Sequence, residues 1–487
     1  MTESPSLTPP RRRWLRFSLR TLLLCVLLIG SSATLWWNWG PWLPEFVLRS
    51  PPDLVQADLL RHGRGLILLF DHPVDKDRRI NEIQYIELPS GRIRYSVRSG
   101  IGGGYVRIST GESTIQLFNH APSAQNIPLM DSWNIETGER LDSDRIFHGS
   151  RNISVQFSHE DRFVYVCSDF TGERTLLKFP ELTPAGNLDE LFKNDFDSND
   201  HPIARSGTFS PLGSWFVNFV TAEKVQFIDL KSNFEMRELV LPYGEDTRWR
   251  RLVFSPNERV LALEYLPSHA GATNKVMLVG AISFASGDLD PRHRFNSLPY
   301  FSKSGEYFVV RNSDDATKEI RRTSDPQTPL WKSQPGPLDW IGDNVLRCDS
   351  QVTLLDGATG VTLWQQPFNT QVRTGSITST EYIALHDAPG SLLLCILNAH
   401  TGRTELNTHD WRWSAQCGEL HSTEFCGDSS CFLAYSRTDT RIRNLAVARR
   451  HSYRWGLASV PEFWLTLVLG AGFLWSVWRD RRLGMRA

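Results

Sequence analysis

The sequence lacks an excess of either charge and lacks any bias toward Gly or Pro. Its 487 residues carry 53 Lys and Arg against 54 Asp and Glu. This balance excludes a protein that coats nucleic acid by bulk electrostatics, so we predict no nucleic-acid partner. The 34 Gly and 27 Pro residues exclude collagen-like and low-complexity designs, and a hydrophobic content of 40 % supports a folded core.

Motifs for metal, phosphate and nucleophile chemistry are also missing. The absence of Cys-x-x-Cys and His-x-x-x-His pairs argues against a structural zinc site, and no Gly-x-Ser-x-Gly elbow is present. Gly102-Gly103-Gly104 has no following Lys-Ser/Thr, which favours a strand hinge over a phosphate loop. The segment Asp195 to Asp200 spaces its oxygens like a calcium loop but lacks the turn Gly, and Ser206 replaces the final Glu, so we favour a solvated acidic loop.

Three polar or aromatic clusters have two interpretations each. Arg61-His62 and Arg292-His293-Arg294 face either a ligand or solvent, and solvated loops are the preferred interpretation. Trp411-Arg412-Trp413 either stacks on a sugar or an arginine, or places both Trp side chains on the buried side of a strand. We therefore assign no catalytic, cofactor-binding or metal-ligating residue, and any cofactor stays unknown.

The seven cysteines leave their pairing open. Cys25 lies in an apolar run near the start, and the other six lie in the middle of the chain. The close spacing of Cys417, Cys426 and Cys431 favours a local disulfide if that part is exported. The alternative is that these residues are small buried hydrophobes.

Uncharged apolar runs stand near both ends. The first predicts a transmembrane helix or signal anchor over residues 21–39, and the second predicts a transmembrane helix over residues 462–478. A cleaved signal peptide ending near Ser31-Ser32-Ala33 is the alternative for the first run, with a twin-arginine signal at Arg12-Arg13 a weaker one. A buried C-terminal helix is the alternative for the second.

Arginine clusters on the outer side of both runs predict the topology. Residues 1–20 and 479–487 form basic tails, which the positive-inside rule places in the cytoplasm. Residues 43–455 are then extracytoplasmic, on the periplasmic side of the cytoplasmic membrane. Tails this short cannot fold alone, which excludes a cytoplasmic kinase, cyclase or DNA-binding module.

The middle of the chain repeats a short strand–turn–strand motif. Phe-Ser pairs begin at Phe157, Phe209, Phe254 and Phe301, at intervals of 52, 45 and 47 residues. Such a period indicates a propeller or solenoid, because a hairpin with one more strand cannot bury both of its faces alone. Stacking the units in a ring covers every face.

A second recurrent feature is Thr-Gly or Ser-Gly after a strand, where Gly permits a turn with positive φ. It occurs at Ser90-Gly91, Thr137-Gly138, Ser286-Gly287, Thr359-Gly360 and Thr401-Gly402. We expect the first or last unit to share a blade, so the prediction is an all-β, seven- or eight-bladed β-propeller, with eight favoured. The two features together delimit candidate units over residues 54–98, 102–145, 151–182, 205–240, 249–290, 297–335, 338–368, 376–410 and 419–447.

These residues carry resemblances to known families. The turn Phe209-Ser-Pro-Leu-Gly213 resembles WD40-type and related bacterial propellers, and Leu354 to Trp364 is similar to the tryptophan-docking repeat of quinoprotein-like propellers. The string Arg16 to Leu23 resembles the start of exported, membrane-anchored proteins of planctomycete bacteria. The repeating Gly-His and Trp-Asp pairs of WD40 units are missing, and the segment Leu397 to Gly402 lacks the closing Trp.

The sequence thus favours a non-enzymatic, membrane-tethered propeller that binds another protein as a scaffold or receptor. The alternative is a propeller enzyme of quinoprotein or hydrolase type with its site on the ring axis, since a fold does not decide a function. A sensor whose two spans relay a state to a second membrane protein is a third hypothesis.

Overall fold

The computed structural model describes most of the chain. The described residues are 19–38, 42–49, 51–75, 79–99, 104–109, 111–119, 130–141, 153–168, 174–179, 183–185, 207–221, 224–232, 234–240, 247–267, 275–280, 294–295, 297–311, 317–374, 379–387, 392–408, 413, 417–438, 441–450 and 461–484. The chain divides into two compact units, residues 44–448 and residues 1–43 with 449–487.

The smaller unit contains two helices, α1 (Leu19–Asn38) and α6 (Pro461–Gly484), which pack against each other. Gly470 and Gly472 of α6 lie opposite Leu28 and Leu24 of α1. No helix in the described part of the chain combines the length and the apolarity needed to cross a membrane. Large apolar side chains are nevertheless exposed on both helices, at Leu22, Leu23, Val26, Leu27 and Ile29 of α1 and at Trp464, Leu465, Leu467, Val468, Leu474, Trp475 and Trp478 of α6.

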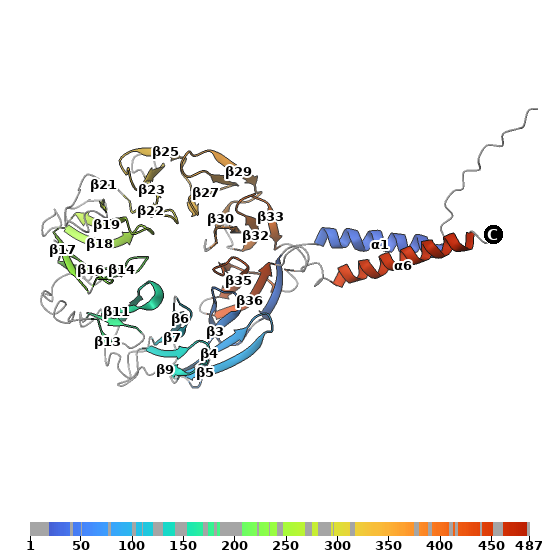
Figure 1. Ribbon diagram of the computed structural model, residues 1–487, viewed down its shortest axis with the longest axis horizontal. Coiled ribbons are helices and arrows are strands. Elements are labelled where there is room, and N and C mark those ends of the chain that lie inside the picture. Colours follow the sequence, from blue (N-terminus) through green and yellow to red (C-terminus); the bar gives the residue numbers. More distant parts are fainter. Residues whose placement is uncertain are drawn as a thin grey trace, which may run out of the picture. The chain divides into compact units, whose positions relative to one another are not determined.

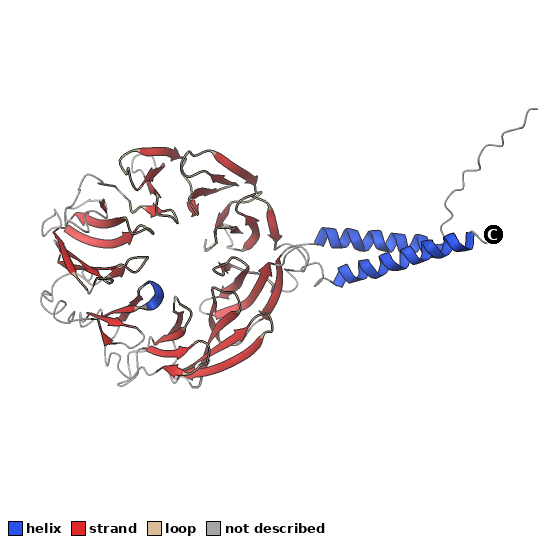
Figure 2. Cartoon of the chain, viewed as in Figure 1, coloured by secondary structure: helices blue, strands red, loops and turns tan. Residues whose placement is uncertain are grey.

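In the larger unit, the described strands form nine four-stranded sheets arranged as the blades of a ring (Figures 1 and 2). Within each blade the first strand lies toward the middle of the ring and the fourth lies at its periphery. The first blade contains β2 (Leu54–Leu59), β3 (Gly65–Pro73), β4 (Arg79–Glu87) and β5 (Arg92–Ser99). The closing blade contains β34 (Ser422–Phe425), β35 (Cys431–Thr438) and β36 (Arg441–Arg450), with β1 (Trp42–Arg49) as its outer strand.

Seven further blades lie between these two and follow the chain in order. The second blade contains β6 (Gly104–Ile108), β7 (Thr114–Asn119), β8 (Met130–Asn134) and β9 (Arg140–Leu141), the third contains β10 (Ile153–Phe157), η1 (His159–Asp161), β11 (Phe163–Ser168), β12 (Arg174–Lys178) and β13 (Thr183–Pro184), and the fourth contains β14 (Thr208–Phe209), β15 (Trp215–Thr221), β16 (Lys224–Asp229) and β17 (Met236–Val240). The fifth blade contains β18 (Thr247–Phe254), β19 (Val260–Pro267), β20 (Lys275–Gly280) and β21 (Arg294–Phe295), and the sixth contains β22 (Tyr300–Phe301), β23 (Tyr307–Arg311), β24 (Lys318–Arg322) and β25 (Pro329–Ser333). The seventh blade contains β26 (Leu338–Ile341), β27 (Asn344–Cys348), β28 (Gln351–Leu355) and β29 (Thr362–Pro367), and the eighth contains β30 (Val372–Thr374), β31 (Tyr382–Asp387), β32 (Leu393–Asn398) and β33 (Thr404–Asn407).

The predicted all-β propeller is confirmed, and each of the nine sequence units has its own sheet. The estimate of seven or eight blades is therefore short of the nine sheets. It assumed that the first or last unit shares a blade, whereas β1, which precedes the first unit, supplies the missing outer strand of the last sheet. The N-terminal strand thus closes the ring without merging two units.

The turn between the first and second strands of a blade, here called the inner turn, explains the repeated serine. In five blades the serine hydroxyl accepts a hydrogen bond from the backbone N–H five residues later, and the residue three positions after the serine has a positive φ. The side chain thereby satisfies a backbone donor that the tight turn would leave unpaired. The bonded pairs are Ser109 with Thr114 (3.0 Å), Ser158 with Phe163 (2.9 Å), Ser210 with Trp215 (2.8 Å), Ser255 with Val260 (2.9 Å) and Ser302 with Tyr307 (3.2 Å).

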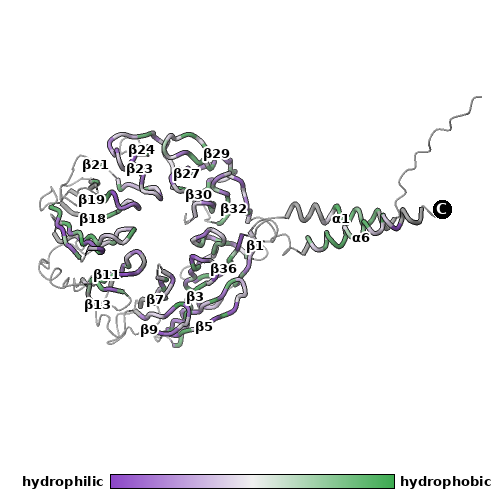
Figure 3. The backbone as a smooth tube through the Cα atoms, in the orientation of Figure 1, coloured by the Kyte–Doolittle hydropathy of each residue, from purple (hydrophilic) through white to green (hydrophobic). Residues whose placement is uncertain are grey.

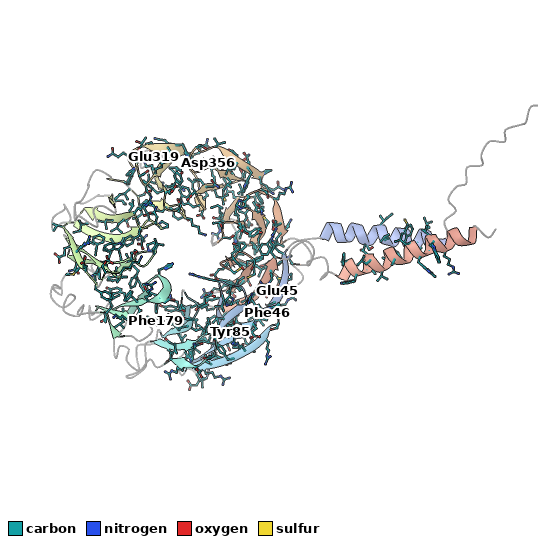
Figure 4. All side chains as sticks on the ribbon, in the orientation of Figure 1. Glu45, Phe46, Tyr85, Phe179, Glu319 and Asp356 are labelled. Atoms are coloured by element: carbon teal, nitrogen blue, oxygen red, sulfur yellow. The ribbon has the colours of Figure 1, made fainter. Side chains whose placement is uncertain are left out.

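The Thr-Gly turns at the periphery receive aromatic side chains from the preceding blade. Trp331 donates from Nε1 to the carbonyl of Gly357 (3.0 Å) and covers Gly360, and Trp364 donates to Ala399 (2.7 Å) and covers Gly402. Tyr95 covers Gly138 and donates to Ile135 (2.8 Å), and Phe46 (Figure 4) covers Gly91. The segment ending at Gly402 therefore needs no closing Trp of its own, because its partner Trp364 belongs to the preceding unit.

Apolar clusters fill the spaces between successive blades. One joins Ile67 and Leu69 of β3 to Ile115 and Leu117 of β7, and another joins Leu346 of β27 to residues of β31 and β32. Figure 3 shows apolar and polar residues mixed along the strands of the ring. Burial of both faces of each blade is the main driving force for this fold.

Gly402→Ala tests the peripheral docking. A Cβ at Gly402 would lie 2.7 Å from Cδ2 of Trp364, whereas Gly342 has a similar φ and open space around it. We expect Gly342→Ala to lower the free energy of unfolding by about 1–2 kcal/mol, the cost of left-handed backbone alone. Gly402→Ala is expected to lower the free energy of unfolding by about 1–3 kcal/mol more than Gly342→Ala, because it also displaces the indole of Trp364. Denaturant unfolding of the full-length protein measures both losses. Equal losses in the two variants would contradict the docking role.

Candidate functional site

Three unusual polar groups gather where the first blade meets the closing blade. This junction, here called the closure seam, is apolar in its middle, where Leu54, Leu66 and Leu68 pack with Leu433 and Val447. The polar groups lie around that core: a pocket at one end of the strands, a carboxylate pair on the inner strands, and a thiol pair at the inner turn.

The pocket, here called the rim pocket, opens near the turn between β3 and β4 and has a volume of about 460 Å³. Alternation along paired strands brings its side chains to one face of the first blade, since Phe70 pairs with Glu82 and His72 pairs with Ile80. Its walls are Pro52, Phe70, His72, Val74, Ile80, Glu82, Gln84 and Arg98.

Glu82 is the buried charge of the rim pocket, with a side chain that is 9 % exposed. Its carboxylate accepts hydrogen bonds from Gln84 (2.7 Å), Ser96 (2.8 Å) and Nε of Arg98 (3.1 Å). Burial acts to raise the pKa of Glu82, but these three donors and the charge of Arg98 outweigh it and lower the pKa. The carboxylate is thus held ionised.

His72 connects the pocket to the closing blade. Its Nε2 lies 3.5 Å from Oε2 of Glu82, its Nδ1 lies 3.5 Å from Oδ2 of Asp53, and its ring stacks on Phe70. Asp53, in turn, is 3.1 Å from Nη1 of Arg441 on β36, and its backbone has a positive φ of 62°. This chain of contacts fixes the imidazole between two carboxylates and ties the pocket to the seam.

The rim pocket places a cation beside an apolar wall. The walls of the rim pocket offer no Ser, Thr or Cys nucleophile, and Glu82 is already saturated with donors. Arg98 uses Nε for Glu82 and its side chain is 73 % exposed, so most of its guanidinium faces solvent beside an apolar wall. A ligand that presents an apolar group next to a carboxylate fits this surface.

A second polar group lies on the inner strands of the seam. Asp58 of β2 and Glu424 of β34 interact electrostatically, and burial together with the Glu424 charge raises the pKa of Asp58 to about 7. Burial also raises the pKa of Glu424. Gln56 donates to Oδ2 of Asp58 (2.7 Å) and pairs with both backbone groups of Val106, which joins the inner strands of two blades. Carboxyl groups with raised pKa values are candidates for proton transfer.

The residues singled out in the sequence have structural places where they are described. Arg61 and His62 belong to the inner turn of the first blade: the N–H of Arg61 donates to Glu112, and Nδ1 of His62 accepts from the N–H of Arg64 (3.0 Å). Trp413 is buried and stacks on Phe432. It lies outside the described strands, whereas the packing interpretation expected a strand that buries both Trp side chains. Residues 102–103, 195–200, 292–293 and 411–412 lie outside the described residues.

Sequence reasoning missed Asp58, His72, Glu82 and Glu424. The local signal for Glu82 was a polar residue in an alternating strand, which does not distinguish it from any solvent-facing position. Within the described part of the chain no group of three His, Cys, Asp or Glu side chains could hold a metal ion.

Comparisons with known proteins give the following. No family model and no curated protein matches the chain. Among solved structures, a eukaryotic initiation factor is similar over 82 % of this chain and 85 % of its own (14 % identity, TM-score 0.42). The Cps50 (Swd1) β-propeller domain of Myceliophteria thermophila is similar over 83 % of this chain and 98 % of its own, with 9 % identity and a TM-score of 0.35. Kuenenia stuttgartiensis hydrazine synthase is similar over 63 % of this chain and 96 % of its own, with 13 % identity and a TM-score of 0.31.

Asp58→Asn tests the carboxylate pair of Asp58 and Glu424. Since the pKa of Asp58 is about 7 in the folded protein against 3.8 when unperturbed, the unfolded state releases the proton first. Stability is therefore lost as the pH rises from about 4 to about 7. The Asn variant is expected to be more stable than the parent by roughly 2–4 kcal/mol at pH 8 and equal to it near pH 4, measured by denaturant unfolding. Asp325→Asn, at an exposed carboxylate, is the control, and parallel profiles for parent and Asp58→Asn would contradict the assignment.

Proposed function

We propose that this chain is a membrane-tethered, extracytoplasmic β-propeller that binds another protein as a scaffold or receptor. The proposed binding role rests on the rim pocket, in which the exposed guanidinium of Arg98 lies beside an apolar wall. The proposed membrane tether rests on the exposed apolar side chains of α1 and α6. Because loops of a propeller lie on a rigid ring, they are suited to presenting such a pocket to a partner.

Exposed apolar side chains support the tether. Val468 and Leu474 of α6 are 67 % and 68 % exposed, and Ile29 of α1 is 63 % exposed. Water penalises an apolar surface of this extent on a small unit, whereas lipid does not. The uncharged run of α6 is short for a bilayer, so Trp464 at one end and Trp478 at the other would lie at the headgroups.

Leu467→Arg combined with Leu474→Arg tests the tether. A charge at the centre of a spanning helix costs about 2.5–3.5 kcal/mol each on insertion scales, so we expect the double variant to leave the membrane fraction after alkaline extraction while the parent stays. Val361→Arg, at an exposed apolar residue of the ring, is the control. A periplasm-specific enzyme reporter inserted directly after Asp387 should be active, and a reporter at the C-terminus should be inactive. The reverse pattern would contradict the proposed side of the membrane.

Arg98→Glu tests the binding role. Peptides selected from a random library on the parent protein are expected to contain an apolar residue next to an acidic one, and to lose at least about tenfold in affinity on Arg98→Glu because like charges then oppose each other. Val361→Glu is the matched control on another blade. Selection of peptides whose binding is unaffected by Arg98→Glu would contradict the rim pocket as the binding site.

A propeller enzyme of quinoprotein or hydrolase type is the second candidate, and the pair of Asp58 and Glu424 on the inner strands favours it. This alternative would be established if the parent protein turns over an ester or alcohol substrate, the Asp58→Asn variant loses that turnover, and the Arg98→Glu variant keeps it. A featureless visible absorption spectrum after reconstitution with a quinone would remove the quinoprotein form.

A further inference from the structure

The inner turn of the closing blade differs from the other inner turns in carrying two cysteines. Cys426 occupies the position of the turn serine, and Cys431 occupies the position five residues later that Val260 holds in the β18–β19 turn. The backbone is the same, since the N–H of Cys426 donates to the carbonyl of Cys431 (3.0 Å), and the N–H of Cys431 donates to Sγ of Cys426 (3.1 Å). The two side chains thus face each other across the hairpin.

The two thiols are in contact and share a space that Gly63 leaves open. The Cys431 thiol hydrogen-bonds to Sγ of Cys426. A Cβ at Gly63 would lie 2.4 Å from Sγ of Cys431 and 3.5 Å from Sγ of Cys426. Directly opposed residues of an antiparallel pair have Cα atoms about 4.5–5.5 Å apart, which is within the span of a disulfide.

The local chemistry also separates this pair from the other buried cysteines. Hydrogen bonds from the thiol and the backbone N–H of Cys431 lower the pKa of Cys426 to about 7, although burial and the hydrogen bond of its thiol to Oδ1 of Asp428 (2.7 Å) oppose this shift. Burial raises the pKa of Cys348 and of Cys395 to about 12. Because the thiolate is the reactive form, Cys426 is the cysteine prepared for exchange.

We propose that Cys426 and Cys431 form a disulfide that staples the inner turn of the closing blade. The Cys426 thiolate attacks one sulfur of a low-molecular-weight disulfide, forming a mixed disulfide and releasing one thiolate. Cys431 loses its proton to solvent and attacks Sγ of Cys426, which releases the second thiolate. The two cysteine sulfurs together give up two electrons, the small disulfide is reduced to two thiols, and the protons of Cys426 and Cys431 end on them.

The staple would act on ring closure because this turn contacts both neighbouring blades. The N–H of Gly427 donates to the carbonyl of Arg61 in the first blade (2.8 Å), and the hydroxyl of Ser429 is 2.8 Å from that of Ser379 in the blade before. A disulfide between the two ends of the turn therefore restricts the segment that links the last blade to the first. Oxidation is expected to raise the apparent Tm of the ring by about 2–4 °C.

Thiol mapping of the full-length protein tests the proposal. The protein is equilibrated with mixtures of reduced and oxidised glutathione, quenched in acid, alkylated under denaturing conditions and digested after Arg and Glu. The fragment covering residues 425–437 then holds Cys426 and Cys431 without Cys417. In oxidising mixtures we expect this fragment to escape alkylation and to be lighter by two hydrogen atoms than its reduced form.

Matched variants decide the outcome. Cys426→Ser and Cys431→Val reproduce residues that other inner turns already use, so both are expected to fold and to lose the redox response of Tm. Cys417→Ser and Cys395→Ala are expected to keep it. Full alkylation of the 425–437 fragment in every mixture, or a disulfide from either residue to Cys417, would overturn the proposal.

Discussion

The contact between neighbouring inner turns is the constraint on which the ring depends. A backbone N–H of one turn donates to a side chain of the next: Gly111 to Asp161 (3.1 Å), Leu212 to Glu258 (2.6 Å) and Ser304 to Asp343 (3.3 Å). Asp161 and Glu258 stand where φ is positive, which turns their carboxylates toward the preceding blade. The same residue that permits the tight turn therefore also links it to its neighbour, so the turns set the spacing of the blades near the axis while apolar packing fills the space outside them.

Much of this architecture could be predicted from local sequence, and the reason is visible in particular residues. Phe209-Ser210 and Phe254-Ser255 mark inner turns because the serine bonds within its own turn. The docking pattern was harder to see because Trp331 and Gly360, or Trp364 and Gly402, belong to successive units, and because Tyr95 and Phe46 replace Trp in two others. The blade number depended on β1, an eight-residue strand that carries no repeat motif and pairs with β36 at the other end of the chain.

The candidate site could not be predicted in this way. Asp58 and Glu424 are close only because the ring closes, and no periodicity relates residues so far apart in the sequence. The same holds for Asp53 and Arg441. In contrast, Cys426 and Cys431 are neighbours in one hairpin, so the crowding of cysteines in the sequence already indicates the segment in which the disulfide is proposed. The pairing itself, including any pairing with Cys417, stays a prediction.

The gathering of these groups at one junction has a physical explanation. The other junctions of the ring join consecutive units, so the chain itself keeps each pair of blades near each other and the contacts between inner turns set their spacing. At the closure seam the first blade meets a blade built from both ends of the chain, and closing so long a loop carries the largest entropic cost in the fold. Specific contacts are needed there: Arg441 reaches Asp53, and Gly427 bonds to Arg61. A junction that must carry special residues for closure departs from the repeat, and this departure distinguishes the closure seam from a junction between similar blades.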